Sequence, residues 1–482
     1  MRGLSILAAF LLLGPSWAAA APPNVVIIIA DDLGWNDVGY HGSEIATPRL
    51  DALARVGLVL EQYHAQPVCS PTRASLMTGK APLRLGVLQP ISKNNQAGLP
   101  LGERTLAQYF RDAGYQTSLV GKWHLGWATR AYQPTSRGFD HFYGYLTGGI
   151  GYWDHVHGGG LDWQRDGVTL REAGYSTDLI ADEAVRTIKG RDPARPLLLD
   201  VSFNAPHLPN EAPADAIARY AQIENPYRRS HAAMVSELDT AIGRVMDALA
   251  AQGLLDDTLV WFMSDNGGLN PKALAGGLQD AMVRLQGWFG KPLPVKFLEF
   301  IRVNTLEGGS DNHPFRRGKN SIYEGGTRVP SLIYWRGTLA PGRVTEMVTV
   351  QDMLPTLLGA AGHPVVGGGF DGVDLWPMLT GAADVPAADY VTHAIDGEAY
   401  YRYPWKLLAL SSGEPELYNL AEDPTEHTNV AAKEPAIVTD LSAALARFPR
   451  GPSIDLPLYK IVWDPDFFGG EEDREPWADR VQ

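Results

Sequence analysis

A single cysteine stands among residues that could do chemistry. Cys69 lies in the run PVCSPTRASLMTG, residues 67–79. Because Pro71 suits a first helical turn and Gly79 a helix end, the sequence predicts that Cys69 lies just outside a helix N-terminus. Free backbone N–H groups and the helix dipole favour an anion there, and Arg73 on the first turn could reach the same point. An inert core cysteine is the common alternative, but the polar neighbours disfavour a wholly apolar site.

Two pairs of oxygen-bearing side chains each follow directly on an apolar run. They are Asp31 and Asp32 after residues 25–30, and Asp265 and Asn266 after residues 258–264. Carboxylate and amide oxygens suit Ca²⁺ or Mg²⁺ better than Zn²⁺, which prefers thiolate and imidazole ligands. Each pair alone would more often be a helix cap or a solvated turn. Their shared placement after apolar runs favours a metal site.

Four apolar runs predict strands that are buried on both faces, in a sheet covered by helices on each side. They are residues 25–30, 117–120, 197–203 and 258–264. Lys122 and His124 follow the second run, and His207 follows the third. In open α/β sheets the ligand site lies at the carboxyl ends of the strands. We therefore expect these side chains to meet the acidic pairs at one sheet edge.

Helical patterns separate these runs, at residues 47–56, 105–113 and 231–251. The alternation predicts an α/β fold with a large, mixed, mostly parallel sheet sandwiched by helices, in a catalytic domain over residues 21–385. Within it, residues 268–310 carry few strand signals and several aromatic residues, which indicates an inserted helical subdomain or lid. Such an insert could narrow the entrance of the site and select the leaving group.

The pattern changes after about residue 385. Short strands at residues 391–395, 405–410 and 416–420, followed by a helix at 437–448, predict a smaller C-terminal α+β domain over residues 386–450, built on an antiparallel sheet. Residues 451–482 combine Pro, Gly and aromatic residues with an acidic cluster, which predicts an extended acidic tail.

Composition limits the compartment and the partners. The chain has 482 residues and a formal net charge of −14, which argues against a nucleic-acid partner. Residues 1–20 combine a positive start, a short apolar run and an alanine-rich end, which predicts a signal peptide rather than an uncleaved anchor. Later segments lack a long apolar run, so we expect no membrane partner. One cysteine and no glycosylation sequon favour a bacterial periplasmic or secreted protein.

Six ordered motifs resemble those of the formylglycine-dependent type I sulfatases, the arylsulfatase family of the alkaline phosphatase superfamily. CSPTRASLMTG fits the C-x-P-S/T-R motif of that family, and the chain's other matching blocks are the strand ending in Asp31–Asp32, GYQTSLVGKWH (114–124), NAPHLP (204–209), SDNGG (264–268) and RGKNSIYEGG (317–326). The block RGFDHFYGYLTGG (137–149) looks most like arylsulfatase B, the N-acetylgalactosamine-4-sulfatase type, and bacterial arylsulfatases. The resemblance implies an alkaline phosphatase-like fold.

Residue by residue, the resemblance also implies a site. One Ca²⁺ would be held by Asp31, Asp32, Asp265 and Asn266, with the side chain of Cys69 close to it. Five basic side chains would surround the sulfate: Arg73, Lys122, His124, His207 and Lys319. A sulfate ester in a largely negative protein needs such local positive charge.

The family also implies a reaction sequence. A formylglycine-generating or sulfatase-maturing enzyme would oxidise Cys69 to formylglycine (3-oxoalanine), whose hydrate offers two hydroxyl groups. One hydroxyl would attack sulfur while Asp265 takes its proton, and His207 or Lys319 would protonate the departing alcohol. His124 would help remove the proton of the second hydroxyl, so that sulfate leaves and the aldehyde returns. For His141, His155 and His157 a structural role is equally expected.

The substrate expected from this resemblance is a sulfated carbohydrate or an aryl sulfate. The aromatic residues of 138–157 could stack on it, or could equally be core residues. The alternatives are a formylglycine phosphonate monoester or phosphodiester hydrolase, a metal-dependent phosphatase, and a non-catalytic relative that binds sulfated glycans.

Overall fold

The computed structural model describes residues 22–158, 160–270, 307–365, 367–384, 388–411, 413–457, 460 and 475–480. The predicted signal peptide and nearly all of the predicted insert at 268–310 lie outside these residues, as does most of the predicted tail. Within the described residues, every helix is too short or too polar to cross a membrane.

One ten-stranded sheet forms the centre of the molecule. Its five middle strands are parallel, in the order β10 (Thr258–Ser264), β1 (Asn24–Ala30), β9 (Leu197–Ser202), β3 (Gln116–Lys122) and β4 (His141–Tyr145). The sheet continues on one side with β11 (Ser331–Tyr334), β2 (Leu58–His64) and β12 (Gly342–Thr349), and on the other with β7 (Gln164–Arg165) and β8 (Val168–Thr169). Since β11 and β7 run antiparallel to their neighbours, the sheet is mixed, and all four predicted strands are confirmed.

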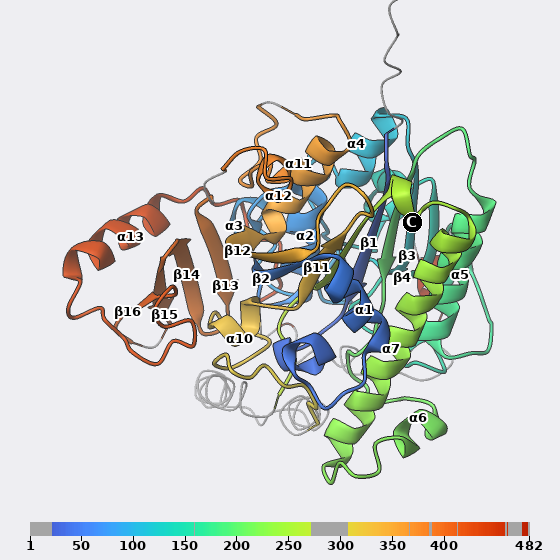
Figure 1. Ribbon diagram of the computed structural model, residues 1–482, viewed down its shortest axis with the longest axis horizontal. Helices are drawn as coiled ribbons and strands as arrows, with labels where there is room; N and C mark the ends of the chain where they lie inside the picture. Colours follow the sequence, from blue (N-terminus) through green and yellow to red (C-terminus); the bar gives the residue numbers. More distant parts are fainter. Residues whose placement is uncertain are drawn as a thin grey trace, which may run out of the picture.

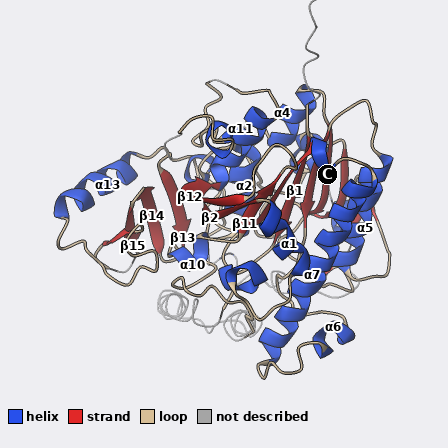
Figure 2. Ribbon diagram, viewed as in Figure 1, coloured by secondary structure: helices blue, strands red, loops and turns tan. Residues whose placement is uncertain are grey.

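Helices cover both faces of this sheet because its central strands are apolar on both sides. In β1, Val25 and Ile27 belong to one buried core, whereas Val26 and Ile28 belong to the other. The first core is covered by α2 (Cys69–Thr78), α4 (Leu106–Asp112) and α11 (Val350–Ala360), and the second by α1 (Pro48–Val56), α5 (Ser176–Gly190) and α7 (Pro226–Ala251). Figures 1 and 2 show the resulting helix–sheet–helix layers, which are the predicted α/β architecture.

The helix boundaries follow the capping residues more closely than the apolar pattern. Thr47 and Thr105 precede α1 and α4 as predicted, and the Thr105 hydroxyl accepts a hydrogen bond from the backbone of Gln108. Helix α7 begins earlier than the predicted residue 231, because the Asn225 side chain accepts hydrogen bonds at its N-terminus and Pro226 occupies the first turn. Apolar periodicity alone could not reveal that cap.

A separate four-stranded antiparallel sheet follows, at the left of Figure 1. Its strands are β13 (Tyr390–Ala394), β14 (Gly397–Arg402), β15 (Trp405–Leu410) and β16 (Glu416–Asn419), and α13 (Pro435–Arg447) packs on it. The predicted strands and helix are confirmed, but the sequence reading missed β14. Its signal was the Asp396–Gly397 pair, a residue combination that favours a tight hairpin.

Short elements complete the described chain. They are α3 (Pro82–Leu85), α6 (Ala214–Ala218), α10 (Glu324–Thr327), α12 (Trp376–Leu379), β5 (Val156–His157), β6 (Gly160–Leu161), and the 3₁₀ turns η1 (Trp35–Asp37), η2 (Gly39–His41), η3 (Arg130–Tyr132), η4 (Pro134–Arg137), η5 (Leu255–Asp257) and η6 (Trp477–Arg480).

Candidate active site

The carboxyl ends of the central strands meet at one edge of the sheet. The register pairs Ala30 of β1 with Ser264 of β10, and Ser202 of β9 with Gly121 of β3. Backbone hydrogen bonds extend this alignment beyond the strands, because the N–H of Asp31 donates to Ala205 and the N–H of Asp265 donates to Ala30, each at 3.0 Å. The four predicted groups of polar residues are therefore neighbours in space.

Cys69 is the first residue of α2, with Val68 as its N-cap, and not a residue outside the helix as the sequence predicted. The helix begins one residue earlier than predicted, because Val68 has the extended backbone of an N-cap and its carbonyl accepts the N–H of Thr72 at 3.3 Å. The Cys69 side chain is 2% exposed, and burial raises the pKa of its thiol, against the opposing effect of Lys122 and Lys319. The residue thus sits at the positive end of a helix, among cations.

Two lysines pair with the two adjacent carboxylates. Lys122 Nζ lies 2.6 Å from Asp31 Oδ2, and Lys319 Nζ lies 2.7 Å from Asp32 Oδ2. Asn266 donates from Nδ2 to Asp32 Oδ1 at 2.7 Å. Asp32 adopts a φ of 68°, in the left-handed region that non-glycine residues rarely occupy. Such strain is typical of functional sites.

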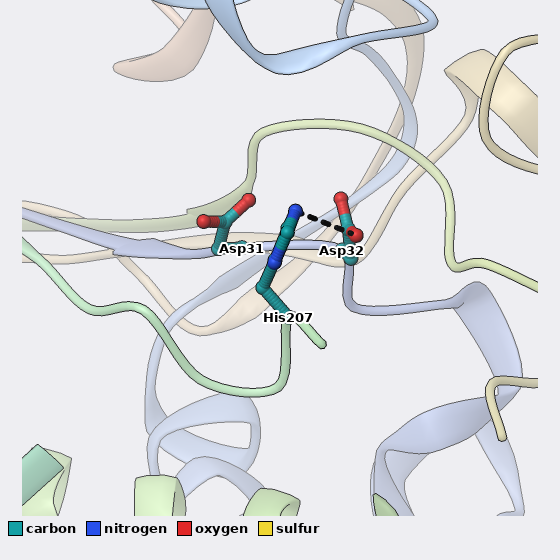
Figure 3. A group of neighbouring side chains, drawn as sticks. All are labelled: Asp31, Asp32 and His207. Atoms are coloured by element: carbon teal, nitrogen blue, oxygen red, sulfur yellow. Dashed lines mark ion pairs between the residues drawn. The ribbon is translucent and has the colours of Figure 1, made fainter. Parts of the chain in front are cut away.

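Two oxygens of this cluster remain without a partner among the described residues. Asp31 Oδ1 and Asn266 Oδ1 are buried and accept no hydrogen bond from the described part of the chain. Leaving a buried acceptor unpaired costs about 1–3 kcal/mol, so such oxygens call for an explanation. Asp31, Asp32 and His207 each offer a ligand atom within 4.8 Å of the others, and Figure 3 shows the His207 ring between the two carboxylates. The oxygens of Asp31, Asp32 and Asn266 are hard ligands that fit a Ca²⁺ ion, whereas the His207 nitrogen is not a typical calcium ligand.

The local charges shift the pKa values of the Asp31 and Asp32 carboxylates in opposite directions. Burial and the neighbouring Asp265 raise the pKa of Asp31 to about 7, although Lys122 opposes the shift. Burial also acts on Asp32, but Lys319 and His207 outweigh it and lower the pKa of Asp32 below its ordinary value. A cation bound beside Asp31 would favour the ionised carboxylate and so lower this pKa.

Arg73 joins three of the converging segments. Its Nε and Nη2 donate to Asp265 Oδ2 at 3.1 and 2.9 Å, and its Nη1 donates to the Lys122 carbonyl at 3.1 Å and to Ser202 Oγ at 3.2 Å. The guanidinium is therefore held in one orientation from both sides. Ser202, which the sequence reading did not single out, contributes to this support.

His124 lies beside Cys69 in a defined tautomer. Its Nδ1 is 3.2 Å from Cys69 Sγ, and its Nε2 is 3.2 Å from the carbonyl of Ile91. Because a carbonyl only accepts, Nε2 carries the proton and Nδ1 presents its lone pair to residue 69. Burial, with Lys122 and Arg73, holds the pKa of His124 well below its ordinary value. The ring is a neutral base aimed at position 69.

His207 and Lys319 both lie beside Asp32. His207 Nδ1 is 2.6 Å from the carbonyl of Leu208, and Nε2 is 3.6 Å from Asp32 Oδ2. Burial and the charge of Lys319 lower the pKa of His207 to about 3. At 22% exposure the His207 side chain is the more accessible of the two, compared with 10% for Lys319.

All the predicted site residues thus gather at one place: Asp31, Asp32, Cys69, Arg73, Lys122, His124, His207, Asp265, Asn266 and Lys319. Of the three histidines for which the sequence leaves a structural role equally open, His141 bonds to Asp166 and Glu183, and His155 stacks on Trp163. Only His157 of these three shares the charge environment of Lys122.

The aromatic loop at 138–157 is mostly core. Phe139, Phe142, Tyr143, Tyr145 and Tyr152 are buried, whereas Trp153 is 49% exposed. The sequence reading also missed the close contacts of Gly148 and Gly149 with the two histidine rings. The glycine pair was visible in the sequence, but what it touches depends on the folded chain.

Comparison with known proteins agrees with this geometry. Residues 23–363 match the family model described as Sulfatase. The chain is 31% identical to arylsulfatase J of Mus musculus, over 93% of this chain and 81% of that protein. It is 32% identical to arylsulfatase A of Homo sapiens, over 78% of this chain and 71% of that protein.

A solved structure is similar over almost the whole chain. The crystal structure of Ps i-CgsB in complex with k-i-k-neocarrahexaose has a TM-score of 0.79 and 28% identity, covering 92% of this chain and 97% of that chain. The phosphonate monoester hydrolase of Agrobacterium radiobacter has a TM-score of 0.59 and 21% identity, over 88% of this chain and 95% of that chain, which shows a shared fold alone.

Proposed function

This chain belongs to the sulfatase family and is a sulfate ester hydrolase, and on that premise we propose that it releases sulfate from sulfated carbohydrates with a formylglycine made from Cys69 and one Ca²⁺ ion. The observation that carries the proposal is the position of Cys69. It lies at a helix N-terminus, 3.2 Å from a neutral histidine base and beside the lysine-paired carboxylates.

Asp31, Asp32, Asp265 and Asn266 would hold the calcium ion. The unpaired oxygens of Asp31 and Asn266 support this assignment, because both would otherwise remain buried without a partner in the described chain. When bound, the ion would stabilise negative charge on the sulfuryl oxygens.

Three cationic side chains would bind and orient the sulfate. Lys122 and Lys319 lie at the carboxylates, and Arg73 is fixed by Asp265 and Ser202. Fixed cations in a buried site need no reorganisation during the reaction, which is why they stabilise a transition state strongly. They also give an acidic protein the local positive charge that its substrate requires.

Two histidines would move protons on opposite sides of the reacting group. His124 would take a proton from the side chain at position 69, since its lone pair faces that residue. His207 would serve the leaving oxygen, with Lys319 as the second candidate. An arriving sulfate ester adds negative charge beside His207, and that charge raises its low pKa towards a value at which it can hold a proton. Asp265 is the proposed acceptor for the attacking hydroxyl.

One structural neighbour favours a carbohydrate ester over an aryl ester: the crystal structure of Ps i-CgsB contains k-i-k-neocarrahexaose. The narrower likeness to the N-acetylgalactosamine-4-sulfatase type, maturation by a formylglycine-generating enzyme, and a periplasmic or secreted location belong to the same proposal.

The test is an ester panel. Protein matured with a formylglycine-generating enzyme is given sulfated oligosaccharides, 4-nitrophenyl sulfate, and matched phosphate and phosphonate esters, and the released anion is measured. We expect the highest kcat/KM on sulfated sugars and none with Cys69→Ala. Faster turnover of the phosphorus esters would overturn the proposal in favour of the phosphonate monoester or phosphodiester hydrolase. Binding of sulfated sugars without turnover by fully modified protein would favour a non-catalytic relative.

A further inference from the structure

The loop from Leu146 to Gly158 lies behind both active-site histidines. A Cβ placed on Gly148 would lie 2.7 Å from Cε1 and 2.8 Å from Nε2 of His124. A Cβ on Gly149 would lie 3.1 Å from Cε1 and Nδ1 of His207. Real Cβ atoms are scarcely found that close, so the glycine backbone packs directly against the two rings. If the loop moved away, both rings would gain room to turn.

The first end of this loop is fixed from inside the protein. The buried Asp162 carboxylate accepts the N–H of Leu146 at 3.0 Å and the N–H of Thr147 at 2.9 Å. In the middle, the Tyr152 hydroxyl lies 2.9 Å from the carbonyls of Asn204 and His207. These contacts connect the first part of the loop to Asp162 and to the segment that follows β9.

The other end is held by a residue from the far end of the chain. Trp477 donates its indole N–H to the carbonyl of His157 at 2.9 Å. Its side chain is 2% exposed and meets Trp127 edge to face, with ring centroids 4.6 Å apart. Next to His157, the carbonyl of Val156 accepts the N–H of Gly151 at 3.1 Å, two residues after Gly149. A continuous set of contacts therefore runs from Trp477 through residues 156–157 to Gly151, beside the glycine pair.

The segment around Trp477 makes two further contacts. Arg480 lies over the indole ring, 4.3 Å from its centroid, and Asp479 accepts a hydrogen bond from Thr169 of β8 at 2.8 Å. These contacts bury Trp477 beside the loop that packs against His124 and His207.

We propose that Trp477 is a positioning residue for the active site, which holds loop 146–158 in place and thereby fixes the rings of His124 and His207. The inference rests on the proposed function, in which these two histidines transfer protons. In that proposal the two histidine rings transfer protons, whereas three other, cationic side chains bind the sulfate. Loss of Trp477 should therefore lower kcat and leave KM nearly unchanged.

The test compares Trp477→Ala and Trp477→Phe with a matched control, Trp335→Phe. Trp335 also donates its indole N–H to a backbone carbonyl, that of Asp256 at 2.7 Å, but it follows β11, in the other half of the sheet. Amide hydrogen exchange of residues 146–158 is measured on each protein. The kcat and KM for 4-nitrophenyl sulfate are then measured, and kcat is divided by the fraction of residue 69 that mass spectrometry shows as formylglycine.

We expect loop exchange to accelerate in both Trp477 variants and to stay unchanged in Trp335→Phe. We expect kcat to fall by about fivefold in Trp477→Phe, as one hydrogen bond is lost, and by about tenfold to a hundredfold in Trp477→Ala, as the rings are misplaced. Unchanged loop exchange, or a loosened loop with kcat equal to that of Trp335→Phe, would overturn the proposal. If modified wild type releases sulfate neither from 4-nitrophenyl sulfate nor from any sulfated oligosaccharide of the ester panel, the proposed function is refuted instead, and the exchange data still decide whether Trp477 holds the loop.

Discussion

Two buried clusters of acids and lysines in the described part of the chain differ in what they can do. The second cluster joins the main sheet to the C-terminal sheet. Lys406 Nζ of β15 lies 2.9 Å from Glu324 Oε1 and 2.7 Å from Glu426 Oε1, and His64 Nε2 lies 2.9 Å from Glu324 Oε2. The side chains of all four residues are fully buried.

The two clusters differ in how far their oxygens are satisfied. In the second cluster, Glu426 Oε2 accepts the N–H of Glu324 at 2.7 Å. Glu426 Oε1 accepts no hydrogen bond from the described chain but forms an ion pair with Lys406 at 2.7 Å, so each carboxylate oxygen has a charged or hydrogen-bonding partner. In the active site, Asp31 and Asn266 each keep one oxygen that the described chain leaves unpaired. The same residue types thus stabilise the fold where the network is closed and can bind a ligand where it is open.

Removing the nucleophile should have the largest effect. It should alter only the active-site cluster, called the open cluster below, and not the Lys406 cluster, called the closed cluster. Cys69→Ala is expected to lower kcat/KM by on the order of 10⁴-fold or more, as for nucleophile loss in other hydrolases. The melting temperature should stay within a few degrees of the wild type, because the side chain is small. Initial rates and calorimetry on the same preparation check both statements, and substantial residual turnover would contradict the assignment of Cys69.

Breaking the closed cluster should cost stability and leave the metal site intact. Lys406→Met leaves Glu324 and Glu426 facing each other without their shared cation, and we expect about 3–5 kcal/mol of destabilisation. Denaturant unfolding of matured wild type and variant measures this difference. A variant as stable as the wild type would show that Lys406 is not needed to join the two sheets.

Calcium should act on the open cluster alone. At a hundred times its Kd, Ca²⁺ should raise the free energy of unfolding by about 2.7 kcal/mol. Asn266→Ala, which removes one of the unpaired oxygens, should weaken Ca²⁺ binding on the order of tenfold to a hundredfold. Lys406→Met is the matched control, because Ca²⁺ should still raise its free energy of unfolding by about 2.7 kcal/mol. Titration calorimetry on chelator-treated protein decides between them, and equal calcium affinity in wild type and Asn266→Ala would refute the metal assignment.

The smallest expected effect is a pH dependence that belongs to the closed cluster. Burial and the charge of Glu324 raise the pKa of Glu426 from 4.5 to about 7, although Lys406 opposes the shift. A raised carboxyl pKa stabilises the fold at pH below 4.5, and this contribution is lost as the pH rises through about 7. Glu426→Gln should therefore gain stability relative to the wild type between pH 5 and pH 8. Parallel unfolding curves across that range would count against this account.

The sequence predicts the open cluster better than the closed one. Asp31 and Asp265 follow apolar strands directly and Lys122 ends one, so the rule that parallel strands end at one edge is enough to bring them together. Lys406 lies inside β15, whereas its partner Glu324 begins the short helix α10 and its partner Glu426 lies in the segment after β16. Their contact depends on how two sheets dock, which no local pattern encodes.

The same reason explains the features that the sequence left out. The tautomer of His124 is set by the carbonyl of Ile91, and the loop behind it is held by Trp477. Both are long-range contacts between loops. The start of α2 at Cys69, by contrast, was missed by one residue because the end of a helix is the least certain part of a pattern.

The most direct test of the central claim is the mass of the peptide that spans Val68–Arg73, from protein made together with a formylglycine-generating enzyme. The account predicts that residue 69 carries the mass change of a thiol converted to an aldehyde, and that the sulfatase activity of different preparations rises in proportion to the modified fraction. Full activity from protein whose residue 69 remains an unmodified cysteine would contradict it.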